Sequence, residues 1–141
     1  MSNWATIENV VELAAAPENV WHAVTNAERI EQWMYPTDFA PEVGRPFTLR
    51  PPANPRADFD GTVTGLVLQA DPARRLTYTW NGGPVVGTVV RFGIEPTERG
   101  ARLELEHSGF DLGAEWGEGA RSGAEVGWPM MLGKLAEVVA R

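Results

Sequence analysis

The sequence predicts an α+β domain in which a curved antiparallel sheet of about seven strands holds a long C-terminal helix across its concave face. Apolar or aromatic residues alternate with polar ones over residues 75–81 and again over 103–107, which indicates strands with one buried face. Over residues 128–139 the apolar residues instead recur every three or four positions, which is typical of one helix face. Short turns separate the alternating segments, so antiparallel pairing is favoured.

The N-terminal third predicts one strand followed by two short helices. Residues 7–13 alternate and form the strand. Pro17 suits the first turn of a helix, where its missing amide hydrogen costs nothing. Thr25 and Glu28 have the spacing of a capping box, so we expect Thr25 to cap a second short helix that ends before Pro36.

The middle of the chain predicts successive strands joined by turns. Alternating segments lie at 47–49, 59–69, 75–81 and 86–94, and a last one ends at residue 107. Gly61 and Gly65 predict a bulge or bend in the second of these strands. The run Asn81-Gly82-Gly83-Pro84 predicts a tight turn.

The last segment predicts the long helix. Residues 109–123 are rich in glycine and are expected to be irregular, with an isolated Trp116 that serves as a lid, a dimer contact or a plug. Pro129 marks either the first turn of the helix or a kink in a helix that begins near Ala124. A helix of about 13–18 residues is roughly 20–27 Å long, which is enough to lie across the sheet.

Composition narrows the possible functions. The 141 residues (1–141) fit one domain, and 12 basic against 19 acidic residues give a net charge of −7. This charge argues against nucleic acid and anionic membrane surfaces as partners. The chain has no cysteine and two histidines, so we expect no disulfide, metal site or cofactor. With no apolar run of roughly 18 residues and no signal-peptide pattern, a cytoplasmic protein is expected.

A hollow between the sheet and the terminal helix is the predicted binding site, and such hollows commonly measure about 300–1,000 Å³. Its expected lining consists of residues that point inward from a strand or helix: Trp33, Met34, Phe47, Tyr78, Trp80, Val90, Phe92, Leu105, His107, Trp128, Met131 and Leu132. For Tyr78 and Trp80 two interpretations stay open. They are either core aromatics with satisfied polar groups or a surface on which a planar ligand stacks.

His107 is the one titratable residue that the strand pattern places on the concave face, so it is the candidate acid or base. Glu104 and Glu106 belong to the opposite face and are not expected to orient it. The alternative is that His107 lines the pocket as a hydrogen-bonding group.

Several short strings resemble the START-like, helix-grip superfamily (SRPBCC), which includes the birch-pollen allergens and polyketide cyclases. Within it, the chain most resembles single-domain homologues of the activator of the heat-shock-protein-ninety ATPase. The strings are Ala16-Pro17 with Val20-Trp21, Trp33-Met34 with Pro36, Val43-Gly44 with Phe47, Arg75-Leu76 with Tyr78 and Trp80, His107-Ser108-Gly109-Phe110, and Gly127-Trp128 with Leu132 and Leu135. They cover nearly the whole chain, and they depart from the family at Arg45 and Ala101. The resemblance implies the helix-grip fold and the binding or transformation of varied hydrophobic molecules.

Three functions follow as hypotheses. The favoured one is the binding or carriage of a small hydrophobic molecule, with aromatic molecules included. The second is a cyclase- or hydrolase-like enzyme that uses His107 as acid or base and Tyr78 or the Trp80 N–H to steady developing charge. A chaperone-associated partner module ranks last, because the chain lacks the further domain of eukaryotic co-chaperones. A homodimer through Trp4 or Trp116 is a further hypothesis.

Overall fold

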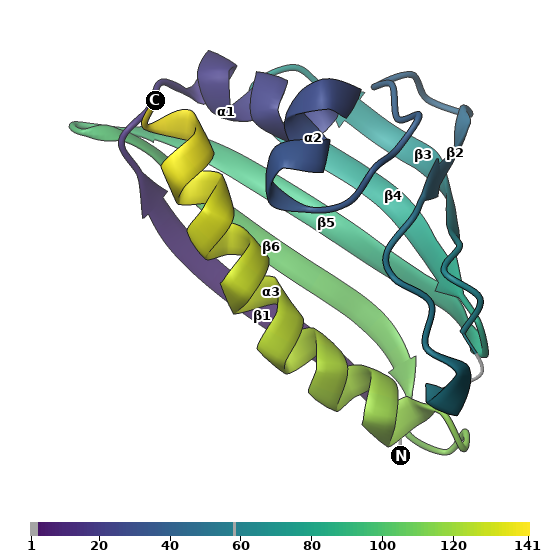
Figure 1. Ribbon diagram of the computed structural model, residues 1–141. Helices are drawn as coiled ribbons and strands as arrows, with labels where there is room; N and C mark the ends of the chain where they lie inside the picture. Colours follow the sequence, from purple (N-terminus) through teal and green to yellow (C-terminus); the bar gives the residue numbers. More distant parts are fainter. Residues whose placement is uncertain (1–2, 58) are drawn as a thin grey trace.

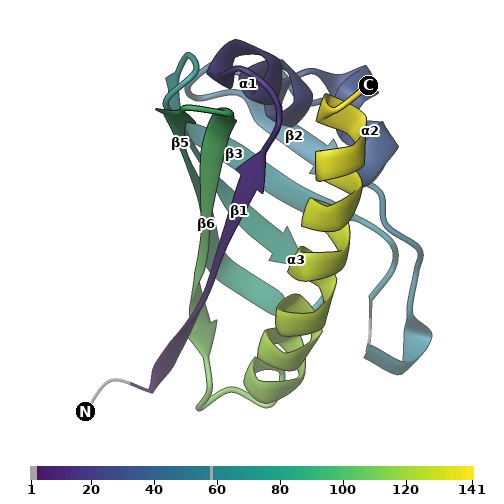
Figure 2. The same ribbon diagram turned by 90° about the vertical axis from the view of Figure 1, so that its left-hand side faces the viewer.

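A computed structural model describes residues 3–57 and 59–141 and shows the expected α+β architecture. The elements follow the order β1 (Trp4–Leu13), α1 (Pro17–Thr25), α2 (Ala27–Trp33), β2 (Pro46–Leu49), η1 (Pro55–Ala57), β3 (Val63–Asp71), β4 (Arg75–Gly82), β5 (Val85–Thr97), β6 (Gly100–Asp111) and α3 (Gly117–Val139). The strands form one antiparallel sheet in the order β1-β6-β5-β4-β3-β2. Figures 1 and 2 show α3 crossing the concave face of this sheet, while α1 and α2 cover the end at which α3 terminates.

The sheet has six strands within the described residues, against the seven expected. Among the residues described between β1 and β3, strand pairing other than that of β2 consists of two isolated bridges, Thr37 with Leu49 and Asn54 with Phe59. Three prolines lie among residues 51–55, and because proline has no amide hydrogen, a continuous ladder does not form there. The strand predicted at 59–69 accordingly begins at Val63.

The predicted irregularity in β3 is present, but it lies further along the strand. The β3–β4 register shifts between Val67 and Gln69, rather than at Gly61 or Gly65. Gly65 has a different role, because a Cβ there would overlap a β4 carbonyl oxygen and the ring of Phe47. The absence of a side chain at Gly65 allows the β4 carbonyl and the Phe47 ring to contact the backbone of β3 directly.

The second helix is capped by a different residue from the one predicted. Asn26, with extended φ −88° and ψ 126°, accepts a hydrogen bond on Oδ1 from the Arg29 amide at 3.1 Å. Thr25 is still inside α1, where its hydroxyl donates to the Trp21 carbonyl at 2.6 Å. The prediction of Thr25 as the cap was therefore wrong by one residue, because α1 and α2 share Asn26 as a junction.

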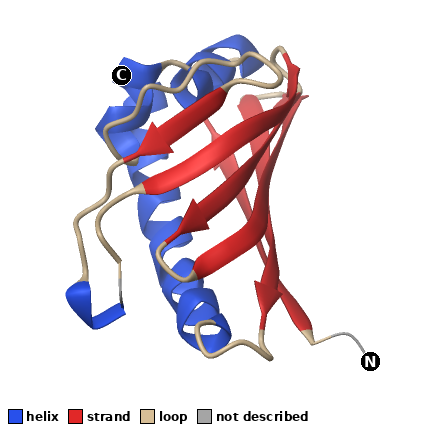
Figure 3. Cartoon of the chain, turned by 90° about the vertical axis from the view of Figure 1, so that its right-hand side faces the viewer, coloured by secondary structure: helices blue, strands red, loops and turns tan. Residues whose placement is uncertain are grey.

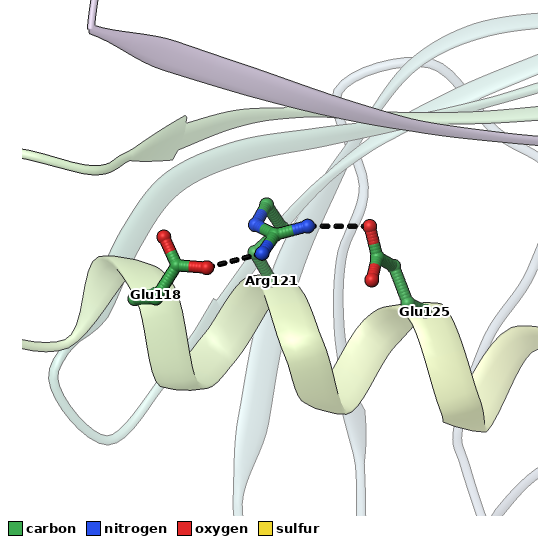
Figure 4. A network of polar contacts seen from close by, with 3 residues as sticks. All are labelled: Glu118, Arg121 and Glu125. Carbon is green, nitrogen blue, oxygen red and sulfur yellow. Dashed lines mark hydrogen bonds and ion pairs between the residues drawn. The ribbon is translucent and has the colours of Figure 1, made fainter.

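The long helix is 23 residues and starts at Gly117, so much of the segment expected to be irregular is regular structure. Within residues 109–123, β6 extends to Asp111 and α3 begins at Gly117, so the irregular part is the short connection between them. Arg121 pairs with both Glu118 and Glu125 at the start of α3, a network drawn in Figure 4. Such pairs at three- and four-residue spacing offset part of the low helix propensity of glycine. Pro129 lies inside α3 and does not mark its first turn.

The two faces of the sheet differ in character. The outer face carries no helix (Figure 3) and presents cross-strand ion pairs, including Arg102 with Glu12 at 2.8 Å and Arg91 with Glu106 at 3.8 Å. These exposed pairs contribute little to stability. The apolar core lies between the concave face and the three α-helices, so the interior is where an apolar guest would have to bind.

Candidate functional site

The concave face is lined by two groups of aromatic rings. Tyr78 lies at the centre of the first group, with ring centroids 5.0 Å from Phe47, 5.7 Å from Phe39 and 6.1 Å from Phe92. Around His107 lies the second group, which contains Phe110, Trp80 and Trp128 with centroids at 4.6, 5.5 and 5.9 Å. Phe92 and Trp128 connect the groups at 6.1 Å. These separations are ordinary for packed aromatic pairs.

A chain of hydrogen bonds joins α3 to three strands through His107. The Trp128 indole Nε1–H donates to His107 Nδ1 at 3.0 Å, so Nδ1 carries no proton. The proton of the neutral ring is therefore on Nε2, which lies 3.0 Å from Thr88 Oγ1 and donates to it. The Thr88 hydroxyl in turn donates to the Trp80 carbonyl at 2.6 Å. Every donor in this buried chain has an acceptor.

This arrangement makes His107 a structural hydrogen-bonding group. Burial lowers its pKa to about 3, and the side chain is only 3% exposed, so the ring is neutral near pH 7. Both nitrogens are engaged, and no carboxylate is hydrogen-bonded to the ring among the residues that the structure describes. A general base needs a free lone pair within reach of a substrate proton. The acid/base role predicted for His107 has no free ring nitrogen here.

One small cavity lies on the concave side, beneath the two short helices. Its volume is about 10 Å³, and its walls are Val24, Ile30, Trp33, Met34, Phe39, Phe47, Leu49 and Tyr78. A space of this size holds about one water molecule. The expectation of a hollow of several hundred cubic ångströms needs correction for this conformation, because aromatic side chains fill the middle of the interior.

The predicted lining residues fall into three sets. Trp33, Met34, Phe47 and Tyr78 line the small cavity. Trp80, His107 and Trp128 form the hydrogen-bonded centre. The remaining five pack around these sets, Val90, Phe92, Leu105 and Leu132 buried and Met131 half-buried.

Sequence reasoning missed Val24, Ile30 and Leu49 as cavity residues and Thr88 as the partner of His107. Each carried a signal, because Thr88 continues the inward alternation of Val90 and the other three lie on predicted apolar faces. Those signals indicate which face of its own strand or helix a residue occupies. They do not indicate which residues of other elements it contacts.

The polar groups of the cavity wall are few. Trp33 Nε1–H donates to the Ala23 carbonyl at 2.8 Å and is therefore satisfied. The Tyr78 side chain is only 4% exposed, and its hydroxyl makes no hydrogen bond with another described residue. The hydroxyl is not one of the fully buried atoms that lack a partner, so a water-sized molecule can reach it. Burial raises the pKa of Tyr78, so the hydroxyl keeps its proton. The wall thus offers a guest hydrocarbon surface and one hydroxyl donor.

Two larger hollows lie outside the interior. One, of about 750 Å³, lies beside the β4–β5 turn and the segment before β3. The other, of about 530 Å³, lies on the outer sheet face among charged residues that include Arg75 and Glu104. Neither contains any residue of the small cavity. Trp116, predicted as a lid, a dimer contact or a plug, is half-buried against the core just before α3.

Within residues 3–57 and 59–141, no group of three acidic or histidine side chains is arranged to hold a metal ion. None of the described helices is both long and apolar enough to cross a membrane.

Comparison with known proteins gives a family and several similar folds. The model of a family described as Activator of Hsp90 ATPase homolog 1-like protein matches residues 14–140. Protein MLL2253 from Mesorhizobium loti is similar at 31% identity and a TM-score of 0.82, over 97% of this chain and 98% of that one. Protein BH1534 from Bacillus halodurans has 24% identity and a TM-score of 0.82 over 99% of both chains. CalU16 from Micromonospora echinospora has 26% identity and a TM-score of 0.73, over 97% of this chain and 76% of that one. No curated protein matches the sequence.

Proposed function

Because the chain belongs to the family described as Activator of Hsp90 ATPase homolog 1-like protein, we propose that it binds or carries a small hydrophobic molecule, aromatic ones included, between its sheet and its helices. The family fold fits a ligand-binding cavity in general. The observation that carries the proposal for this chain is the enclosed apolar cavity beneath α1 and α2. A guest there would replace at most one water, and it would meet hydrocarbon on nearly every side.

Binding at this place requires the cavity to widen, and Met34 is the side chain best suited to move. It is half-buried, it lies at the C-cap of α2 with φ −125° and ψ −99°, and it is unbranched and flexible. The other walls are rigid rings or fully buried aliphatic side chains. An outward swing of Met34 joins the cavity to solvent without unpacking the aromatic centre around His107.

The energy available fits modest affinity. Burial of about 300 Å² of apolar ligand surface at about 25 cal/mol per Å² gives roughly 7–8 kcal/mol before the costs of immobilisation. The cost of holding the cavity open lowers the apparent affinity further. We therefore expect dissociation constants in the micromolar range or weaker for an unselected hydrophobic probe.

Titration with the neutral fluorescent probe N-phenyl-1-naphthylamine tests the proposal. Wild type should show saturable enhancement of probe fluorescence, and Met34→Ala should bind about tenfold more tightly because the opening step is already made. Met130→Ala is the matched control, because Met130 is 64% exposed on the outer side of α3. Its affinity should equal that of wild type. Absence of saturable binding in both wild type and Met34→Ala, or equal affinities in all three proteins, would contradict binding in this cavity.

The enzyme alternative lacks a supporting observation. His107, the proposed acid or base, has no free nitrogen, because Nδ1 accepts from Trp128 and Nε2 is bonded to Thr88. Nor does any geometry described above favour a chaperone-associated module, so hydrophobic binding is the one function proposed.

A further inference from the structure

Tyr78 is the one polar side chain of the cavity wall whose hydrogen-bonding capacity is left over. Its ring is held on three sides by Phe39, Phe47 and Phe92, at centroid distances of 5.0 to 6.1 Å. Its hydroxyl, by contrast, has no protein partner within residues 3–57 and 59–141. Among the described residues, the one fully buried side-chain atom without a partner is Arg29 Nε, so the Tyr78 hydroxyl touches a space that a water-sized molecule can enter.

Packing alone does not explain the hydroxyl. Phenylalanine has the same ring, and the neighbouring positions of this cluster already use it. The free volume of about 10 Å³ in the same wall is large enough for one oxygen atom of water size. An oxygen that belongs to a bound molecule satisfies the hydroxyl equally well and displaces the water.

Resting on the proposed function, we infer that the Tyr78 hydroxyl is the hydrogen-bond donor that orients the bound molecule, which is therefore a hydrophobic molecule with an acceptor oxygen, such as a carbonyl, at one end. The hydroxyl can donate across the ordinary pH range, since burial raises its pKa. The three surrounding rings hold the phenol ring, and with it the hydroxyl oxygen, in place before binding, which reduces the ordering cost of the contact. Tyr78 thus sets specificity, while Met34 controls access.

The test uses two probes of nearly equal shape, 2-acetylnaphthalene and 2-ethylnaphthalene, which compete with N-phenyl-1-naphthylamine. They differ by a carbonyl in place of a methylene. Wild type should bind the ketone about three- to tenfold more tightly than the hydrocarbon, the range expected for one neutral hydrogen bond. Tyr78→Phe should bind the two alike. Tyr35→Phe, which changes the other of the two tyrosines, should keep the wild-type preference because Tyr35 does not line the cavity.

A spectroscopic readout separates hydrogen bonding from packing. The carbonyl stretching frequency of bound 2-acetylnaphthalene should be lower in wild type than in Tyr78→Phe, because a donated hydrogen bond weakens the C=O bond. Tyr78→Phe removes only an unpartnered hydroxyl, so its urea unfolding midpoint should equal or exceed that of wild type.

The failure of this inference is distinguishable from the failure of the proposed function. Equal affinity of wild type for the two probes, or a ketone preference that persists in Tyr78→Phe, overturns the role of Tyr78 and leaves hydrophobic binding intact. If neither probe binds to wild type or to Met34→Ala, both the inference and the proposed function are overturned.

Discussion

Acidification should destabilise the fold through His107 in a way that a single substitution can isolate. The folded ring has a pKa of about 3 because it is buried, whereas an unfolded histidine titrates near 6.5. Between these values the unfolded chain binds a proton that the folded chain does not. The unfolding free energy therefore rises with pH over this window, and it falls as pH is lowered from about 6.5 towards 3.

The size of the effect follows from the pKa difference. At pH 4.5 the unfolded histidine is protonated with a free-energy gain of about 2–3 kcal/mol, from two pH units at about 1.4 kcal/mol each. That amount is a large share of the total of about 5–15 kcal/mol typical of a domain. Protonation would also remove the acceptor lone pair on Nδ1, which receives the Trp128 indole N–H. The cost of protonating the buried ring and the loss of this hydrogen bond therefore both weaken the contact between His107 and Trp128.

Urea unfolding at pH 7.5, 6.0 and 4.5 measures this contribution as a difference between proteins. Wild type should lose about 2–3 kcal/mol more than His107→Gln between pH 7.5 and 4.5, because carboxylate titrations are common to both and cancel. His22→Gln is the matched control, since His22 is exposed on α1, and it should follow the wild-type pH dependence. NMR of the His107 ring carbons gives an independent reading in wild type. A ring that becomes protonated near pH 6.5, or identical pH slopes for wild type and His107→Gln, would refute the reasoning.

Two further predictions are read by the same urea assay. Thr88→Val removes the acceptor of the His107 Nε2–H and the donor to the Trp80 carbonyl, so it should cost about 2–4 kcal/mol, and a loss below about 0.5 kcal/mol would contradict the hydrogen-bonded chain. Gly65→Ala forces a Cβ into a β4 carbonyl and should lower the unfolding free energy by at least about 3 kcal/mol. Gly123→Ala on α3 places its Cβ with no atom within 4 Å and should stabilise the fold by about 0.5–1 kcal/mol. Equal effects of the two substitutions would show that close approach of other groups is not what requires glycine in β3.

The order of elements could be predicted because burial leaves a period in the sequence. Strand β6 and the C-terminal part of α3 bury one face each, so the sequence shows both the alternation and the helical spacing. The start of α3 could not be predicted, because the glycines of residues 109–123 lower the helix propensity of that segment. Gly117 is required for a different reason, since a Cβ there would overlap the Asp111 carbonyl. The Glu118–Arg121–Glu125 pairs are local helix signals that the glycines obscured.

The site could be predicted only as a face. Alternation indicates that Tyr78 and His107 point inward, but it carries no information about the distance to the opposite layer. Whether the interior is hollow depends on where the large side chains of α3 land, and the indole of Trp128 reaches His107 and fills the centre. The cavity that remains is formed where α1, α2, β2 and β4 meet. No single segment encodes that meeting point, which explains why Val24 and Leu49 were not foreseen as its walls.

Intermolecular NOEs between bound N-phenyl-1-naphthylamine and the protein's methyl groups test the central claim most directly. Binding in the interior cavity predicts NOEs from the probe to the methyl groups of Val24, Ile30 and Leu49, which line the cavity on different elements. NOEs confined to exposed methyl groups such as those of Val126, or no NOE at saturating probe, would contradict the account.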